Sequence, residues 1–466
     1  MDIEKQIKTE LNLLNEENFN LIIWKSFDRL NEAFEGKTDI DFYLSNQSID
    51  NLDLKLKELN WVKFKSEHWR NFKEVHDYFK VNFDSKKKEI KLIHFHIHEK
   101  IRTGDRFIKS LEIPAKFINT DLEYRNGFLT LNRVKEFELS IMRSAFKLKI
   151  IDYIMSLIRF DKQRLFIYQN ETKSLYNFLS AEDIKNLEIN LNFKLITYLS
   201  SESIMFTWAC RRKIKNKYKK FKKYKPSILF YFKLISSKIL IDGKYIKKGL
   251  HVSIVGVDGV GKSSSIKNIY STLGNQIRFK VIYFGIPKSI ARLRKKLFIL
   301  KNIFNKNKNK KTEYSTNSTL SNSKFKVFND TVFSVLVTLI KILKFIQLKI
   351  FLFFGYIVFT DRYPIEDIVD FNPQWKSSKL LKLQFKTNNI FTKPQLFVLL
   401  KLNEDDLESR NKNLNSRLLI QNKKIQFELI NYFKINNHLI LDNMSCNFKS
   451  NEMKILEEMI TKINSK

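Results

Sequence analysis

The chain has very little cysteine and no apolar segment at its start. Its 466 residues include two cysteines, Cys210 and Cys446, which lie far apart and form no C-x-x-C pair. This spacing argues against a structural zinc site and favours a reducing compartment. The first ten residues, MDIEKQIKTE, are charged and lack the apolar core of a secretory signal peptide. We therefore expect a cytoplasmic protein.

Acidic residues are also scarce relative to basic ones. There are 84 Lys and Arg against 49 Asp and Glu, so the formal net charge is +35. Part of this excess reflects the Lys-, Asn- and Ile-rich usage of an AT-rich genome. The rest favours acidic partners: nucleotides, anionic lipid, sugar phosphates or nucleic acid. A hydrophobic content of 43% with 14% aromatic residues excludes a disordered chain, and the length suffices for two or three domains.

Residues 256–263 read GVDGVGKS, a complete G-x-x-x-x-G-K-S phosphate loop. Residues 251–255 before it predict a buried strand, and residues 264–273 after it predict an amphipathic helix, which is the context that the motif requires. In such a loop the backbone N–H groups surround a polyphosphate, Lys262 reaches its β- and γ-phosphates, and the Ser263 hydroxyl ligates Mg²⁺. We expect the triphosphate to be bound by Gly256, Val257, Asp258, Gly259, Val260, Gly261, Lys262, Ser263 and Ser264. The alternative is an ordinary glycine-rich turn.

Two short strands in the first 100 residues carry polar side chains in alternation. Asp39 and Asp41 follow a turn at Gly36 and point to the same side of a predicted strand. Two carboxylates placed in this way suit a divalent metal held against a triphosphate, whereas the alternative is a solvated strand edge. Residues 90–97 predict a further strand, and its alternation brings three histidines to one face: His94, His96 and His98. They indicate either a metal site or exposed histidines.

This N-terminal pattern resembles the nucleotidyltransferase superfamily, in which a helix precedes a D-x-D strand. Lys25-Ser26 stands where that family usually has Gly-Ser, and the histidines stand where its third carboxylate is expected. Residues 95–114 and 138–146 further resemble a bacterial fusion in which a nucleotidyltransferase-like domain precedes a thymidylate kinase-like domain. Such proteins are often encoded among polysaccharide-biosynthesis genes.

The middle of the chain predicts helices and a basic linker. Residues 211–225 contain a run of Lys and Arg with Ile, Tyr and Phe between them. One reading is a solvated connecting helix; the others are contact with an anionic membrane surface or with a nucleic-acid backbone, of which we expect the membrane rather than nucleic acid. We place the domains at 1–150 (nucleotidyltransferase-like, α+β), 151–248 (helical segment and linker) and 249–466 (P-loop kinase-like, α/β).

The last 215 residues predict further strands of a parallel α/β sheet with flanking helices: residues 279–284, 356–360, 395–402 and 437–442. The strand at residues 356–360 runs directly into Asp361-Arg362-Tyr363. Parallel strands deliver their carboxyl ends to one crevice, so Asp361 can hold Mg²⁺ beside Ser263 while Arg362 neutralises an acceptor phosphate. Residues 327–354 are apolar with three interrupting lysines, which favours an amphipathic core helix over a membrane-inserted one.

A phosphate loop followed by a strand that ends in Asp-Arg-Tyr resembles the thymidylate kinases. The resemblance implies ATP with Mg²⁺, an acidic loop residue at Asp258, lid arginines at Arg410 and Arg417, and a plausible dimer. No N-K-x-D motif is present, which favours ATP over GTP. That family usually has Arg-x-Pro-Gly where residues 284–288 read FGIPK, so dTMP itself cannot be inferred, and Lys288, Arg292 and Arg294 could serve a different phosphorylated or sugar-like acceptor. We expect a nucleoside monophosphate, dTMP-like, or a related acceptor. The alternatives are a nucleotide-binding regulatory or scaffold protein at the membrane surface and a bifunctional nucleotidyltransferase–kinase.

Overall fold

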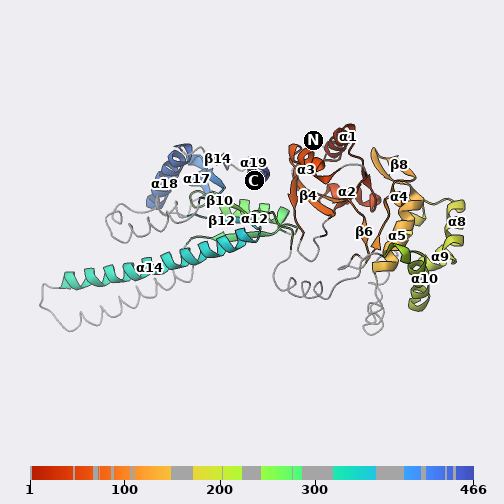
Figure 1. Cartoon of the computed structure of the whole chain (residues 1–466). Helices are drawn as coiled ribbons and strands as arrows, with labels where there is room; N and C mark the ends of the chain where they lie inside the picture. The colour runs from red at the N-terminus through yellow and green to blue at the C-terminus, as the bar shows by residue number, and fades with distance from the viewer. Residues whose placement is uncertain are drawn as a thin grey trace. The chain divides into compact units, whose positions relative to one another are not determined.

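The computed structural model describes residues 3–45, 48–66, 72, 74–84, 89–104, 109, 111–147, 172–201, 203–222, 243–274, 276–285, 318–363, 393–410, 416–435, 438–443 and 448–465. The chain divides into two compact units, Met1–Lys244 and Tyr245–Lys466. Figure 1 shows their elements along the chain. Each unit has a sheet of its own and is described by itself.

The first unit is built on a mixed seven-stranded sheet with the order β3-β4-β5-β2-β1-β9-β8. Strand β2 pairs with β5 in parallel and with β1 in antiparallel orientation, while β4 and β5 form a long antiparallel hairpin. The strands are β1 (Leu21–Ile23), β2 (Ile40–Leu44), β3 (Val62–Phe64), β4 (Val75–Asp84), β5 (Glu89–His98), β8 (Leu122–Arg125) and β9 (Phe128–Leu131); β6 (Arg102–Thr103) and β7 (Leu111–Glu112) pair separately.

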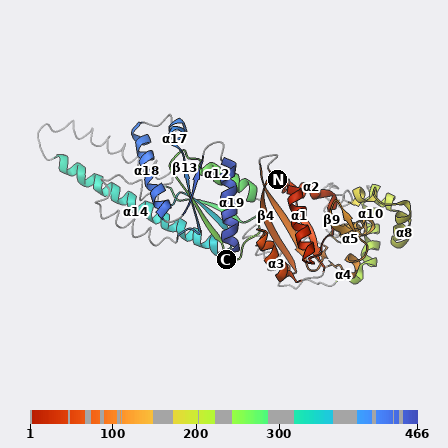
Figure 2. The same cartoon turned by 90° about the horizontal axis from the view of Figure 1, so that it is seen from above.

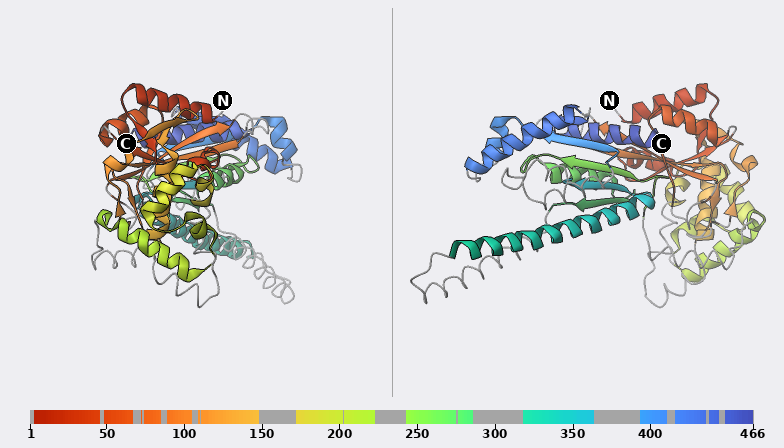
Figure 3. Two further views of the ribbon diagram at one scale, coloured as in Figure 1. Left: turned by 90° about the vertical axis from the view of Figure 1, so that its right-hand side faces the viewer. Right: turned by 60° about the vertical axis from the view of Figure 1, so that its left-hand side comes forward.

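Helices cover both faces of this sheet. Successive strand residues point to opposite faces, so Ile23 and Phe42 join one hydrophobic core while Ile22 and Tyr43 join another. In Figure 3 the N-terminal helices lie on one side of the strands and the later ones on the other. The first set is α1 (Ile3–Glu16), α2 (Leu30–Phe34) and α3 (Ile49–Glu58); the later set includes α4 (Ala115–Ile118), α5 (Arg133–Lys147), α8 (Ala181–Leu191), α9 (Leu195–Ser200) and α10 (Ile204–Lys217).

The structure does not separate the predicted helical segment from the domain before it. Helices α8 to α10 contribute to the same core as Trp24 and Phe137, and α10 packs on α5, α8 and α9. The basic run that starts on α10 takes part in this packing: Arg211, Ile214 and Tyr218 are all buried. The other basic side chains are mostly exposed, namely Arg212, Lys213, Lys217, Lys219, Lys220 and Lys222, so contact of this run with an anionic membrane stays a prediction. Residues 223–225 lie outside the described residues.

The second unit has a five-stranded sheet in which every pairing is parallel, with the order β11-β12-β10-β13-β14. Figure 2 shows α12 and α19 on one face of the sheet and α14 and α18 on the other. The expected parallel sheet flanked by helices is thus confirmed. Its elements are β10 (Leu250–Val255), α12 (Lys262–Leu273), β11 (Phe279–Tyr283), α14 (Ser318–Phe353), β12 (Ile357–Asp361), β13 (Leu396–Lys401), α17 (Glu404–Arg410), α18 (Ser416–Ile435), β14 (Leu439–Asp442) and α19 (Phe448–Asn464).

The strand order of the second unit reverses direction at β10. Strand β10 is central and buried along its whole length, as expected for a strand covered on both faces. The chain passes to β11 and β12 on one side of β10 and then to β13 and β14 on the other. A crevice opens beyond the carboxyl ends of the strands at such a reversal of direction. The phosphate loop follows β10 directly and therefore lies at this point.

Helix α14 differs from the amphipathic helix that the lysines predict. Its second half packs on β11 and β12 through Val337 and Leu348, but Lys341 is buried as well. On the outside, an apolar series recurs every three or four residues and is exposed in the described part of the chain: Leu336, Leu339, Leu343, Ile346, Ile350 and Phe353. No helix among the described residues combines the length and apolar character needed to cross a membrane.

Candidate functional site

The phosphate loop connects β10 to α12 in a tight turn. Gly256, Gly259 and Gly261 all have positive φ, which side-chain-bearing residues rarely adopt. The turn also passes close to the ends of neighbouring strands: a Cβ on Gly261 would lie 2.6 Å from Nδ2 of Asn443. The loop is therefore fixed by its own backbone and by the residue that follows β14.

Substituting Gly261 with alanine should destabilise this turn. The backbone has φ 98° there, and the added methyl group meets Asn443. We expect a loss of about 1–3 kcal/mol in the free energy of unfolding, together with weaker nucleotide binding. The matched control is Gly127→Ala in the first unit, where φ is 82° but a Cβ meets only ordinary contacts. Chemical denaturation of both variants tests this, and equal losses would contradict the role given to Asn443.

Lys262 is the first residue of α12 and is almost completely buried. Its ammonium group donates hydrogen bonds to the carbonyl oxygens of Gly256 and, at 3.0 Å, Val257. The positive charge is thus held over the loop, on the side where the backbone N–H groups at the start of α12 lie. This combination of a fixed cation and a helix N-terminus suits a polyphosphate.

Ser263 and Asp361 meet across two neighbouring strands. The Ser263 hydroxyl donates a 2.7 Å hydrogen bond to Oδ2 of Asp361, the last residue of β12. Asp361 is 8% exposed and is therefore largely shielded from bulk solvent. A hydroxyl and a carboxylate are hard oxygen ligands of the type that Mg²⁺ prefers. The donor set therefore fits the metal that the sequence predicts at these two residues.

The next residue, Arg362, forms an ion pair with Asp258 of the phosphate loop. Its backbone is left-handed, with φ 67°, which is unusual for a residue with a side chain and often marks a functional position. Asp258 is well exposed, and its carboxylate lies 3.9 Å from Nζ of Lys262. Both predicted residues thus lie at the outer edge of the loop, with their charges facing each other.

Arg410 reaches the same region from α17. Its guanidinium donates a 3.1 Å hydrogen bond to the backbone oxygen of Asn443. The buried Asn443 amide in turn donates a 2.6 Å hydrogen bond to the carbonyl oxygen of Val260. The sequence analysis missed Asn443, although its place directly after β14 was a signal.

Among the other predicted residues, Ser264 is the third residue of α12. The side chain of Arg417 in α18 is not described, and Lys288, Arg292 and Arg294 lie outside the described residues.

His251 on β10 provides a test of the core behind the site. Burial lowers its pKa to about 3, and the Lys349 ammonium of α14 adds to this effect. The unfolded chain, with a histidine pKa of about 6.5, then binds the proton first, so stability falls as the pH drops from about 6.5 towards about 3. At pH 5 the loss is about 2 kcal/mol relative to neutral pH.

His251→Gln should remove this loss. Urea denaturation at pH 7.5 and pH 5 should show a steeper decrease in the free energy of unfolding for the parent protein than for the variant. His438→Gln is the control, because His438 is only partly buried. Parallel pH profiles for the parent protein and His251→Gln would contradict the prediction.

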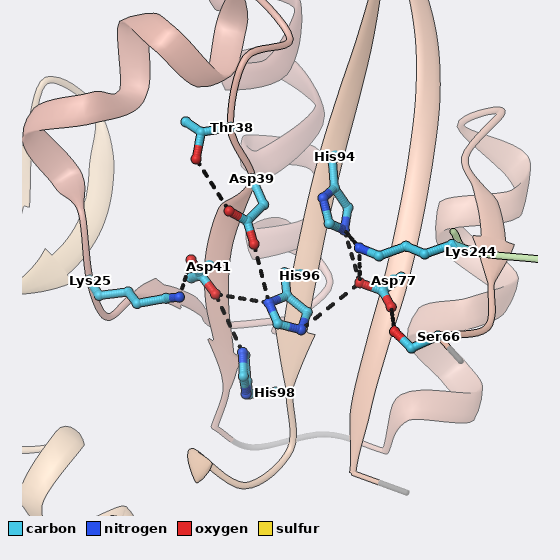
Figure 4. A network of polar contacts seen from close by, with 10 residues as sticks. All are labelled: Lys25, Thr38, Asp39, Asp41, Ser66, Asp77, His94, His96, His98 and Lys244. Carbon is cyan, nitrogen blue, oxygen red and sulfur yellow. Dashed lines mark hydrogen bonds and ion pairs between the residues drawn. The ribbon is translucent and has the colours of Figure 1, made fainter. Parts of the chain in front are cut away.

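The first unit contains a second group of predicted residues, shown in Figure 4. Strand β2 lies between β1 and β5, so Asp41 is buried and the alternative of a solvated strand edge is wrong. Asp39 and Asp41 both reach His96, whose Nδ1 lies 3.4 and 3.0 Å from their carboxylate oxygens. Burial raises the pKa of Asp41, but the Lys25 ammonium and the neighbouring histidines outweigh it, and the pKa lies well below the usual range.

Asp77 belongs to this group and was missed by the sequence analysis. It lies on β4 directly opposite His96 of β5 in the strand register. Its carboxylate accepts hydrogen bonds from Lys244 at 2.7 Å and from Ser66 at 2.5 Å, and it lies 2.9 Å from Nε2 of His94. A carboxylate is thus present near the histidines, but it lies on β4 and not on β5, the histidine strand on which it was expected. The three histidines are not exposed, since His94 and His98 are buried and His96 is 15% exposed at its side chain.

Comparison with known proteins gives limited results. No protein-family model matches the chain, and no curated protein does. Among solved structures, the chain is similar to a thymidylate kinase from Candida albicans, with 19% identity and a TM-score of 0.29, over 47% of this chain and 94% of the kinase. It is also similar to a thymidylate kinase from Ehrlichia chaffeensis, with 15% identity and a TM-score of 0.27, over 46% of this chain and 99% of the kinase. Similarities at this level add nothing to the geometry described above.

Proposed function

We propose that the second unit is an ATP- and Mg²⁺-dependent phosphotransferase that transfers the γ-phosphoryl group to a nucleoside monophosphate, dTMP-like, or to a related acceptor of surface-polysaccharide synthesis. One observation carries this proposal. Ser263 of the phosphate loop and Asp361 of the neighbouring strand are in hydrogen-bond contact, beside the buried ammonium of Lys262. Loop amides, cation and oxygen ligands thus converge where parallel strands end.

The residues would divide the work as follows. The N–H groups of the loop and Lys262 bind the β- and γ-phosphates and fix the terminal phosphorus in position. Ser263 and Asp361 would hold Mg²⁺, which would supply positive charge against the phosphate oxygens. Catalysis of this kind depends on positioning and on electrostatic stabilisation of the transferring group rather than on covalent chemistry.

The arginines would act on the side of the acceptor and on the transferring group. Arg362, released from Asp258, pairs with an acceptor phosphate, and Asp258 then orients the acceptor. Arg410 stands beside the loop through its contact with Asn443 and stabilises negative charge on the transferring phosphoryl group, together with Arg417.

The experiment that tests the proposal is a turnover assay on the full chain with ATP, Mg²⁺ and a panel of nucleoside monophosphates and sugar phosphates. We expect ADP formation that depends on one class of acceptor and is matched by phosphorylated product. Saturable ATP binding without any transfer would instead support the regulatory or scaffold alternative. ADP formation equal to that of a Lys262→Ala variant would contradict the proposal.

The bifunctional alternative, in which Asp39 and Asp41 perform nucleotidyl transfer, receives less support. His96 lies against both carboxylates, where a site of oxygen ligands alone would need a third acidic residue. The first unit therefore contains a mixed set of nitrogen and oxygen ligands, which suits a different metal.

A further inference from the structure

Three neighbouring strands of the first unit bring polar residues into one row. Asp41 on β2 pairs with His96 on β5, and His96 pairs with Asp77 on β4. His98 follows two residues later on the same face of β5, whereas Phe95 and Ile97 point into the hydrophobic core on the opposite face. The sheet itself thus positions two imidazoles and a carboxylate together.

The three ligand atoms already have the spacing of a metal site. Oδ1 of Asp41 lies 3.0 Å from Nδ1 of His96 and 3.4 Å from Nε2 of His98. All three residues offer ligand atoms within 4.8 Å of one another. Ligands at about 2.0–2.2 Å from a tetrahedral ion are about 3.3–3.6 Å apart. Small side-chain adjustments would therefore suffice to bind an ion.

His98 is the second, independent indication of a ligand. It is 1% exposed, and within the described part of the chain neither of its ring nitrogens makes a well-formed hydrogen bond, since Oδ1 of Asp41 lies 3.4 Å from Nε2. Buried polar atoms nearly always have a partner, so an imidazole without one requires an explanation. Figure 4 shows the ring directed at Asp41.

The surrounding residues orient the ligands as in known metal sites. Lys25 binds Oδ2 of Asp41 at 2.7 Å, which leaves Oδ1 directed at the two histidines. The other ring nitrogen of His96, Nε2, faces Oδ1 of Asp77 at 3.9 Å. A metal-binding histidine commonly has a carboxylate behind its second nitrogen, which fixes the tautomer and the ring orientation.

We propose that Asp41, His96 and His98 form a binding site for one late first-row divalent ion of the Zn²⁺ type. Two imidazoles and one carboxylate suit such an ion, whereas Mg²⁺ prefers oxygen ligands. A fourth position lies on the side of Asp39, which is 34% exposed at its side chain and reaches His96. Lys25 and Lys244 add positive charge near the site, so an anionic fourth ligand such as hydroxide or phosphate is favoured.

The test uses the full chain without nucleotide and Co²⁺ as a visible probe. We expect one equivalent of Co²⁺ per chain with the intense visible absorption of a four-coordinate site, displaced by Zn²⁺ but not by excess Mg²⁺. An ion held by the oxygen ligands Ser263 and Asp361 would give only weak absorption, so failure here leaves the proposed phosphotransferase untouched. Absence of this absorption, or of Zn²⁺ binding by calorimetry at micromolar protein, would overturn the metal site.

Substitutions distinguish the residues that bind the ion from neighbouring residues that do not. His98→Ala should weaken Zn²⁺ binding at least 100-fold, and Asp77→Asn, which acts through His96, about 10- to 100-fold. His76→Gln is the matched control, because His76 lies on β4 and pairs with Glu99 outside the row. If His98→Ala does not fold, His98→Phe and Asp41→Asn replace it. Binding that survives all of these changes, or that is lost equally in His76→Gln, would overturn the assignment.

Discussion

Lys262→Ala is expected to lower the rate of phosphoryl transfer from ATP by about 100-fold or more. The ammonium group is buried and fixed over the phosphate loop by two backbone carbonyls, so no neighbouring lysine can take its place. Its charge would act where negative charge is concentrated on the β- and γ-phosphates, and burial of the side chain reduces screening by solvent. The transfer rate and the ATP concentration dependence are measured on the same preparation.

The control for this variant is Lys267→Ala, five residues further along α12, where the lysine is exposed. It removes the same charge from the same helix without touching the loop, and should leave the transfer rate within about twofold, since exposed charges act weakly at a distance. Lys262→Met keeps most of the packing and serves as a check on folding. Equal losses in Lys262→Ala and Lys267→Ala would contradict a specific role for Lys262.

Asp361→Asn should reduce transfer by about 100-fold and raise the Mg²⁺ concentration that is needed for half-maximal rate. The amide has the size of the carboxylate and can still accept the hydrogen bond from Ser263, so the link between the loop and β12 is retained. The negative charge that attracts Mg²⁺ is lost. The informative measurement is therefore the rate as a function of Mg²⁺ at fixed ATP, rather than a single rate.

Asp442→Asn is the matched control, because Asp442 is also the last residue of a strand in the same sheet. It is exposed and pairs with Lys401 at 3.0 Å, away from Ser263. We expect an unchanged dependence on Mg²⁺. A similar shift of the Mg²⁺ dependence in both variants would show that any negative charge at this edge of the sheet has the same effect. It would contradict the role of Asp361 as a metal ligand.

The parts of the second unit that could be predicted are those that depend on local sequence. The phosphate loop and its flanking strand and helix are specified within 25 residues, and Asp361 follows from the rule that parallel strands end at one edge. The place of Asn443 after the last strand was a signal, but its contact with Val260 could not be predicted, because it joins residues 183 positions apart and depends on how β14 is placed. The same holds for the left-handed backbone of Arg362.

In the first unit, alternation along the strands correctly predicted that Asp39 and Asp41 share a face. It could not show that β2 is a central strand, and so it left open whether these carboxylates are solvated. Asp77 needed the register of the β4–β5 hairpin, which no local pattern supplies. For a related reason, the sequence could not show that Arg211 is the buried member of the basic run, since burial depends on the helix face that packs on the core.

The most direct test of the central claim is an equilibrium titration of the full chain with a fluorescent ATP analogue in the presence of Mg²⁺. The account predicts saturable binding of one nucleotide per chain, displaced by unlabelled ATP and lost in Lys262→Ala. Binding that fails to saturate at millimolar nucleotide, or that is the same in Lys262→Ala as in the parent protein, would contradict it.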